Sequence, residues 1–219
     1  HALGVSAPLC DALRALGITE PFAVQALVLP DALLGVDILA ESPTGSGKTL
    51  AFGLPLVERT AGAQRRPAAL VLVPTRELAS QVVEVMAPLG KVVGARVAAF
   101  YGGTSIDRQL RHLTRRVEVA VATPGRLIDL LEREALDLDQ IATLVIDEAD
   151  RMADMGFLPQ VEWILRHTKT RHQTLLFSAT LDGAVDVLVK RYQNDPVRHE
   201  VTPPADEEDR TTHVFLDTR

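Results

Sequence analysis

Six short apolar runs alternate along the chain with stretches in which hydrophobic residues recur at helical spacing. The runs cover residues 36–40, 69–73, 97–101, 117–122, 141–146 and 173–177. Apolar residues follow one another in these runs, whereas a strand with one face in water would alternate apolar and polar residues. The pattern therefore predicts an α/β fold with a mostly parallel sheet and helices on both of its faces.

The segment after the last apolar run has a different character. Residues 203–209 read Pro-Pro-Ala-Asp-Glu-Glu-Asp, which is typical of a solvated acidic linker, and residues 211–216 alternate like a strand. We therefore expect one domain over residues 1–200. We expect residues 201–219 to hold the linker and the first strand of a second domain.

Composition limits the chemistry and the partners. The net charge of −6 argues against a protein that coats nucleic acid by bulk electrostatics, although a local basic patch can still bind a strand. Cys10 is the only cysteine, which excludes an internal disulfide and a zinc site built on cysteines. No apolar run approaches the length of a membrane span and no secretory signal opens the chain, so we expect a soluble, cytoplasmic protein.

Residues 42–49, Ser-Pro-Thr-Gly-Ser-Gly-Lys-Thr, lie between the first apolar run and a helical pattern. The two glycines allow the backbone to approach a phosphate group, and the amides that open a helix point at it. Lys48 can reach the outer phosphates, and the Thr49 hydroxyl can hold Mg²⁺. A strict phosphate-loop pattern has glycine where this chain has Ser42, and the alternative is an ordinary turn between a strand and a helix.

Polar, glycine or charged residues also follow the other runs. These segments are Pro74-Thr75-Arg76-Glu77, Gly102-Gly103, Thr123-Pro124-Gly125-Arg126, Asp147-Glu148-Ala149-Asp150 and Ser178-Ala179-Thr180. Taken singly, several of them are typical of turns. In a parallel sheet, however, ligands bind beyond the carboxyl ends of the strands, so together these segments line the edge where chemistry is expected.

Asp147 and Glu148 directly follow the fifth run. In a protein with a phosphate loop, an acidic residue at the end of an apolar strand is placed to hold Mg²⁺ or its waters. The neighbouring Glu148 is placed to orient or deprotonate an attacking water. The alternative is a helix start that is rich in acidic residues, which the helix dipole also favours.

The ordered set of motifs from Gly17 to Thr180 resembles the DEAD-box family of ATP-dependent RNA helicases, and in particular its first RecA-like domain. The literal Asp-Glu-Ala-Asp at 147–150 and Ser-Ala-Thr at 178–180 make this resemblance specific. The resemblance implies a RecA-like phosphate-loop fold, ATP and Mg²⁺ as ligands, and RNA as partner. It also implies a second RecA-like domain in the same protein.

The resemblance implies roles for individual positions. The expected nucleotide-binding residues are Ile18, Gln25, Pro43, Thr44, Gly45, Ser46, Gly47, Lys48 and Thr49, with Gln25 as the residue that reads the adenine edge. Lys48, Asp147 and Glu148 are expected to be catalytic, with Glu148 as general base, and Thr49 and Asp147 to contact Mg²⁺. Thr75, Arg76, Gly103, Thr123 and Arg126 are expected to hold the RNA sugar-phosphate backbone, which would make binding tolerant of sequence. Asp150, Ser178 and Thr180 resemble the group that links hydrolysis to strand separation.

Two positions depart from the family's adenine motif. Ile18 stands where the family favours an aromatic residue, and Phe22 stands where it favours Ser or Thr. The leading hypothesis is an ATP-dependent RNA helicase, of which this chain is the N-terminal half and is nearly inactive alone. One alternative is an ATP-gated RNA clamp or assembly scaffold with little unwinding. The other is a DNA-directed helicase or an unrelated phosphate-loop ATPase.

Overall fold

The computed structural model describes residues 3–63, 67–113, 116–168, 171–181 and 183–201. Within them, one sheet has the strand order β3-β4-β2-β5-β6-β1-β7. The strands are β1 (Ile38–Glu41), β2 (Ala69–Leu72), β3 (Val97–Phe100), β4 (Val119–Ala122), β5 (Thr143–Ile146), β6 (Gln173–Ser178) and β7 (Val197–Glu200). Every strand pair is parallel, which confirms the predicted fold class and brings all the carboxyl ends to one edge.

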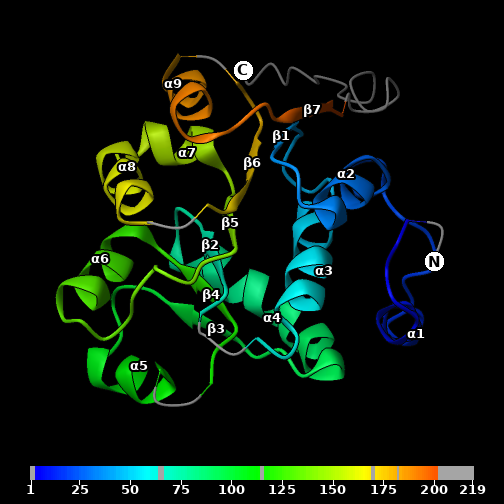
Figure 1. Ribbon diagram of the computed structural model, residues 1–219, viewed down its shortest axis with the longest axis horizontal. Coiled ribbons are helices and arrows are strands. Elements are labelled where there is room, and N and C mark those ends of the chain that lie inside the picture. Colours follow the sequence, from blue (N-terminus) through cyan, green and yellow to red (C-terminus); the bar gives the residue numbers. More distant parts are fainter. Residues whose placement is uncertain (1–2, 64–66, 114–115, 169–170, 182, 202–219) are drawn as a thin grey trace, which may run out of the picture.

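Helices cover both faces of the sheet (Figure 1). The helices are α1 (Ala7–Ala15), α2 (Ala23–Leu34), α3 (Lys48–Thr60), α4 (Arg76–Val93), α5 (Ile106–Leu113), α6 (Pro124–Glu132), α7 (Ala149–Asp154), α8 (Leu158–His167) and α9 (Gly183–Tyr192). Helices α1 to α4 pack on one face, and α5 to α9 pack on the other.

The strand sequences explain why two cores form. Successive side chains of a strand point to opposite faces of the sheet. In β2, Ala69 and Val71 therefore join the core beneath α1 to α4, whereas Leu70 and Leu72 join the core beneath α5 to α9. Because both sets must be buried, the strand is apolar at every position, as the sequence pattern indicated.

The six predicted strands are confirmed, and their ends differ from the predicted ends by at most two residues. The seventh strand, β7, was not predicted because Val-Arg-His-Glu is mostly polar and exposed. Pairing with β1 holds it, together with an Arg198–Glu41 ion pair at 2.9 Å and a contact of 2.9 Å between His199 and Asp31 on α2. The predicted linker and strand fall at 202–219, outside the described residues.

The strand order divides the carboxyl edge into two groups of neighbouring ends. The ends of β1, β6 and β5 lie side by side, and so do those of β2, β4 and β3. Residues 42–49, 178–180 and 147–150 consequently belong to one group, whereas Thr75, Gly103 and Thr123 belong to the other.

Candidate functional site

The loop between β1 and α3 has the backbone of a phosphate-binding turn. Gly45 and Gly47 adopt left-handed conformations, with φ of +80° and +87°, and Gly47 caps the N-terminus of α3. A Cβ on Gly47 would also overlap the Phe22 ring and the Gln25 amide, so no other residue fits there. The first helical amides therefore open toward the edge of the sheet, where an anion is stabilised by the helix dipole.

Ser42 takes the place of the first glycine of the strict pattern and fits without disturbing the loop. Its amide donates to the Ser178 carbonyl at 2.9 Å, which ties the loop to β6. Among the described residues, the hydroxyls of Ser42 and Ser46 are buried and have no hydrogen-bond partner. Buried hydroxyls of this kind are suited to a ligand that brings its own oxygens. Pro43 and Thr44 lie between them at the surface of the loop, half-buried and exposed respectively.

Lys48 and Asp147 meet beneath this loop, although 99 positions separate them in the numbering. Lys48 begins α3 and is only 6% exposed, and Asp147 follows β5 and is 2% exposed. The Lys48 Nζ donates to the Ser42 carbonyl at 3.4 Å and lies 3.9 Å from the Asp147 Oδ1. Burial raises the pKa of Asp147 from its ordinary 3.8 to about 6, an effect that the charge of Lys48 opposes and that of Glu148 reinforces.

Thr49 is half-buried on the first turn of α3, next to Lys48. A hydroxyl and a carboxylate are oxygen ligands of the kind that Mg²⁺ takes. The donor set of Thr49 and Asp147 therefore fits that ion, and the buried hydroxyls of the loop fit the phosphates that would share it.

Glu148 adopts a left-handed backbone conformation, with φ of 55° and ψ of 52°, at the N-terminus of α7. This conformation costs on the order of 1 kcal/mol or more for a residue with a side chain. The Glu148 amide donates to the Asp147 Oδ1 at 3.0 Å, which compensates part of that cost. The Glu148 carboxylate lies 3.0 Å from the Arg151 guanidinium and is 12% exposed.

Asp150 and Ser178 interlock the ends of β5 and β6. The Asp150 amide donates to the Ser178 Oγ at 3.1 Å, and the Ala179 amide donates to the Asp150 Oδ2 at 3.2 Å. Ser178 is fully buried, whereas Thr180 is exposed two residues further along. Two hydrogen bonds therefore join the segment after β5 to the end of β6.

Gln25 connects the start of α2 to the phosphate loop. Its Oε1 accepts from the Phe22 amide and its Nε2 donates to the Gly47 carbonyl, each at 3.0 Å. Phe22 is 60% exposed, and its ring lies over Gly47. Phe22 has no hydroxyl with which to cap α2. An amide carries two N–H donors and two acceptor sites, so Gln25 keeps hydrogen-bonding capacity for a ligand.

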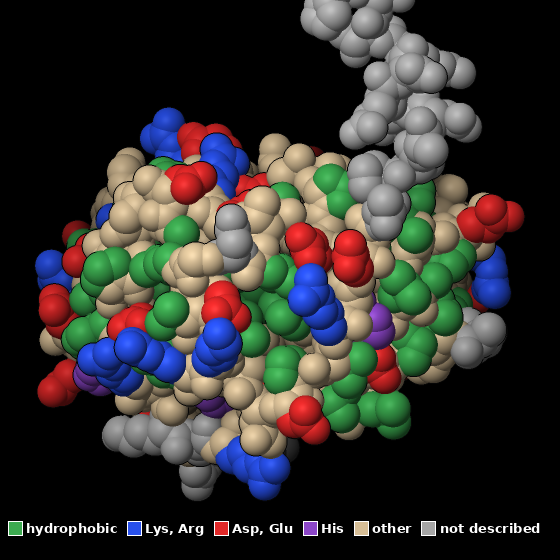
Figure 2. Space-filling model, turned by 90° about the horizontal axis from the view of Figure 1, so that it is seen from above, with side chains coloured by type: hydrophobic (Ala, Val, Ile, Leu, Met, Phe, Trp, Pro, Cys, Tyr) green, Lys and Arg blue, Asp and Glu red, His purple; other side chains and the backbone are tan. Residues whose placement is uncertain are grey.

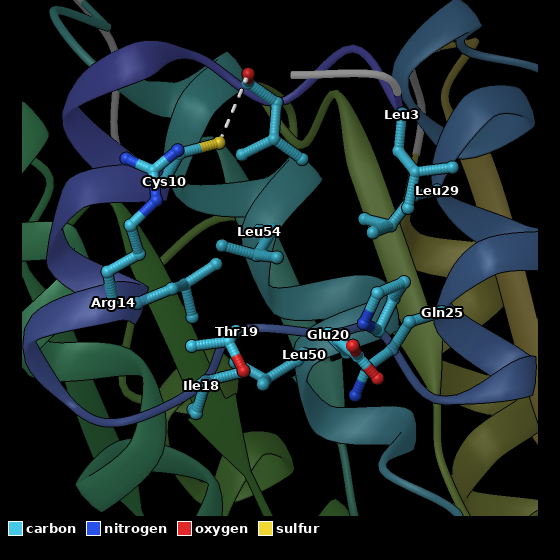
Figure 3. A pocket seen from close by; sticks show the side chains of 13 residues that line it. Leu3, Cys10, Arg14, Ile18, Thr19, Glu20, Gln25, Leu29, Leu50 and Leu54 are labelled. Atoms are coloured by element: carbon cyan, nitrogen blue, oxygen red, sulfur yellow. Dashed lines mark hydrogen bonds between the residues drawn. The ribbon is translucent and has the colours of Figure 1, made fainter.

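Two adjoining hollows flank Gln25. One, of about 360 Å³, is lined by Ile18, Phe22 and the loop between them. The other, of about 220 Å³, is mostly apolar and lies between α1, α2 and α3, with Leu29 and Leu54 in its wall (Figure 3). Periodicity did not predict this second cavity, because it depends on how α1 packs against the other helices.

The ends of β2, β3 and β4 carry the other predicted residues. Thr75 caps α4, and its Oγ1 accepts from the Leu78 amide at 3.2 Å. Arg76 is exposed, and a hydrogen bond to Glu77 raises the pKa of its guanidinium. Gly103 has φ of +82°, and a Cβ there would lie 3.5 Å from the Arg76 Nη1. The Thr123 amide donates to the Phe100 carbonyl at 3.0 Å and so joins β4 to β3.

Arg126 organises this second group, and sequence reasoning missed its main partner. The Arg126 guanidinium donates to the Gln109 Oε1 at 2.8 Å and to the Thr104 carbonyl at 3.1 Å, and it lies 3.5 Å from Asp129. Gln109 is buried on α5, and its Nε2 donates to the Tyr101 carbonyl at 2.9 Å. Arg126 thus holds the glycine turn after β3 in place. The sequence signal for Gln109 was its position as a polar residue on the buried side of the strongly amphipathic helix α5.

The surface is consistent with the small net charge. Figure 2 shows positive and negative side chains interspersed across that face, with hydrophobic side chains between them. No helix in the described part of the chain is long and apolar enough to cross a membrane.

Comparison with known proteins places this geometry in a family. The family model for DEAD/DEAH box helicase matches residues 22–187. ATP-dependent RNA helicase DbpA of Bacillus subtilis is 44% identical over 197 residues, which are 90% of this chain and 41% of that protein. ATP-dependent RNA helicase DeaD of Escherichia coli is 46% identical over 195 residues, 89% of this chain and 31% of that protein. The chain thus spans less than half the length of both relatives.

A solved structure extends the likeness to three dimensions. The crystal structure of a DEAD box protein from Methanococcus jannaschii superposes with a TM-score of 0.86 at 35% identity, over 91% of this chain and 55% of that one. The match confirms the RecA-like fold. Because the family model covers most of the chain and its namesake residues 147–150 lie at the end of β5, beside the phosphate loop, the chain belongs to the DEAD/DEAH box helicase family.

Proposed function

We propose that this chain is the N-terminal, ATP- and RNA-binding domain of an ATP-dependent RNA helicase. The Lys48–Asp147 pair buried beneath a glycine-rich loop is the observation that carries the proposal. Residues 1–200 form this domain. Residues 201–219 begin the connection to a second RecA-like domain, which completes the ATP site and the RNA groove.

ATP binds with its phosphates over residues 43–49 and its base against the hollow beside Ile18. Adenine presents an amino donor and a ring-nitrogen acceptor on one edge, which a glutamine amide matches with its oxygen and nitrogen. Guanine presents a carbonyl oxygen in place of the amino group, and this oxygen would face the Gln25 Oε1. Gln25 therefore favours adenine, with its orientation held by Phe22 and Gly47.

Lys48 contacts the outer phosphates, and Thr49 and Asp147 hold Mg²⁺. A bound Mg²⁺ supplies positive charge against the phosphate oxygens. Glu148 is the general base: it accepts a proton from the water that attacks the γ-phosphorus while the bond from that phosphorus to the bridging oxygen breaks. Arg151 pairs with one oxygen of the Glu148 carboxylate, at 3.0 Å.

RNA binds along the ends of β2, β3 and β4 by its sugar-phosphate backbone. Thr75 and Thr123 offer hydroxyls, the Gly103 turn offers amides, and Arg76 offers an exposed cation that is paired with Glu77. Asp150 and Ser178 tie the end of β5 to the end of β6 within the nucleotide group. Because β5 lies next to β2, we expect a nucleotide-dependent change at this pair to reach the RNA group across that boundary. These contacts carry little base information, so many RNA sequences should bind.

The test uses the full-length protein that contains this chain. We expect RNA to stimulate its ATP hydrolysis and ATP to drive displacement of a short RNA strand. A Glu148→Gln variant should still bind ATP and RNA but hydrolyse ATP about 10²-fold more slowly or worse, because the base is lost. Glu162→Gln, on α8 and outside the strand ends, is the matched control and should behave as wild type.

Three outcomes would count against this proposal in different ways. Normal hydrolysis by Glu148→Gln would refute the assigned base. ATP-dependent retention on single strands without duplex release would favour a clamp or scaffold. Equal stimulation by DNA and RNA would argue against RNA as the substrate, because a contact to the 2′-hydroxyl distinguishes the two.

The 219-residue chain alone should hydrolyse ATP barely, since an arginine supplied across a phosphate site is worth about 10³ to 10⁵ in rate.

A further inference from the structure

β3 is an edge strand, and half of its main-chain groups point away from the sheet. Its neighbour in the described part of the chain is β4 alone. The Arg96 carbonyl accepts from the Val119 amide at 3.1 Å, and the Phe100 carbonyl accepts from the Thr123 amide at 3.0 Å. In a parallel strand, main-chain groups alternate sides, so Ala98 also faces β4, whereas Val97 and Ala99 face outward.

A groove of about 490 Å³ runs along this open edge. Val97, Ala98 and Ala99 form its floor, α4 contributes Val83 and Glu84 to one wall, and α5 contributes Arg108 and His112 to the other. The two helices lie on opposite faces of the sheet and flank the edge strand (Figure 1). The unpaired edge is thus accessible between two walls.

The two walls differ in chemistry. The side chains of Val97 and Ala99 belong to the core on the α4 side, where Val83 adds an apolar surface and Glu84 would repel an acid. On the α5 side, Arg108 and His112 lie one helical turn apart, and the exposed guanidinium of Arg108 attracts an acid. Successive side chains of an added strand would point alternately to these two walls.

We propose that the groove binds an extended segment of a partner protein as an additional strand beside β3. Hydrogen bonds to the outward groups of Val97 and Ala99 supply affinity. Apolar side chains of the segment face α4, and acidic side chains alternate with them and face Arg108 on α5. Val97 and Ala99 lie outside the proposed nucleotide and RNA sites, although the groove also takes in Thr104 and Gln109, which Arg126 contacts, and so adjoins the proposed RNA site at one end.

A peptide suits this groove better than a nucleic acid strand. The floor offers alternating N–H and C=O groups spaced for another backbone, whereas RNA recognition depends on cations along a phosphate chain and on stacked bases. The lining places Val83, Val97, Ala98 and Ala99 beside the two cations Arg96 and Arg108, and Glu84 opposes a phosphate.

The probe is a capped peptide of alternating valine and glutamate, six residues long, titrated into the 219-residue chain. We expect the amides of Val97 and Ala99 to gain protection from hydrogen exchange, measured by NMR. The amides of Ala98 and Phe100 should not change, because they already face β4. A peptide with lysine in place of glutamate should bind at least tenfold more weakly.

Two variants make the test specific. Ala99→Pro removes an outward N–H, which an edge strand tolerates, and should weaken binding at least tenfold while Mg-ADP still binds. Arg108→Glu changes an exposed side chain, so it keeps the test valid even if the proline variant fails to fold, and it should reverse the preference between the two peptides. Arg133→Glu, an equal charge change at the end of α6, should leave that preference unchanged.

The proposal is overturned if the amides of Val97 and Ala99 do not respond to about 1 mM peptide. It is also overturned if Ala99→Pro binds as well as wild type, since the peptide would then not lie on the edge. Displacement of the peptide by a single-stranded RNA that protects no β3 amide would assign the groove to nucleic acid instead.

Discussion

At the ends of β1, β5 and β6 the functional side chains are largely buried and bonded to one another, whereas at the ends of β2, β3 and β4 more of them are exposed. Lys48, Asp147 and Ser178 are all buried, but Arg76 and Gly103 face solvent. Lys48, Asp147 and Ser178 are held by contacts within the protein, whereas the buried hydroxyls of Ser42 and Ser46 have no partner. We therefore expect the first group to keep most of its geometry when a ligand binds. The exposed members of the second group, such as Arg76, are free to change their contacts if RNA binds there as proposed. In the proposed function, one sheet edge thus combines a more rigid nucleotide half with a more adaptable RNA half.

The largest expected effect is on the rigid half. Lys48→Ala removes the cation beneath the phosphate loop and should weaken Mg-ADP binding by about 100-fold or more, because charge-assisted contacts to phosphate in a buried site are strong. Isothermal titration calorimetry on the 219-residue chain measures it. Lys91→Ala, at the exposed end of α4, is the control; if it and Lys48→Ala bound ADP alike, the buried lysine would not be the phosphate contact.

The next effect is a pH dependence that comes from the burial of Asp147. Burial raises the pKa of Asp147 to about 6, so between about pH 4 and pH 6 the folded chain keeps a proton that the unfolded chain releases. The contribution of Asp147 to stability therefore falls as pH rises through this window. Asp147→Asn, which mimics the protonated form, should gain about 2–3 kcal/mol in free energy of unfolding relative to wild type between pH 4 and pH 7.

Urea unfolding of the two proteins at several pH values measures this difference. Parallel curves for wild type and Asp147→Asn would mean that Asp147 titrates as an ordinary surface acid, and the contrast between the two halves would lose its electrostatic basis.

A smaller effect is expected in the RNA half. Arg126→Ala deprives the Gln109 amide and the Thr104 carbonyl of their donor, which should lower the free energy of unfolding by about 1–3 kcal/mol and weaken single-stranded RNA binding several-fold. Arg126→Lys should rescue little, because an ammonium cannot replace the planar guanidinium fork. Full rescue by lysine would show that only the charge matters. Thermal unfolding and fluorescence anisotropy with labelled RNA measure the two effects.

The strands of the rigid half could be predicted from the sequence because each is a short, continuous apolar segment. Each buried strand is a short apolar run, and the residues after it are where a parallel sheet places its ligands. The Lys48–Asp147 contact follows from two strand ends that share one edge. Strand order could not be read from the pattern, so the position of β6 between β1 and β5, which lets Ser178 bond to Asp150, was not foreseen.

What the sequence did not predict depends on contacts between distant, mostly polar residues. β7 has no apolar pattern, and pairing with β1 makes it a strand. Gln109 was not singled out from the sequence, and its contact with Arg126 is visible only in the folded structure. The left-handed backbone of Glu148 is stabilised by its neighbour Asp147, and nothing in the residue type predicts it. The outward groups of β3 likewise depend on which strand lies at the edge.

The most direct test of the account is a calorimetric comparison of Mg-ADP and Mg-GDP binding to the 219-residue chain and to Gln25→Ala. The glutamine amide is fixed between Phe22 and Gly47 and should read the adenine edge. Mg-ADP should bind wild type at least tenfold more tightly than Mg-GDP, and Gln25→Ala should lose most of that preference. Equal binding of the two nucleotides by wild type would contradict the adenine assignment, and no binding of either would contradict a nucleotide site already formed in this domain.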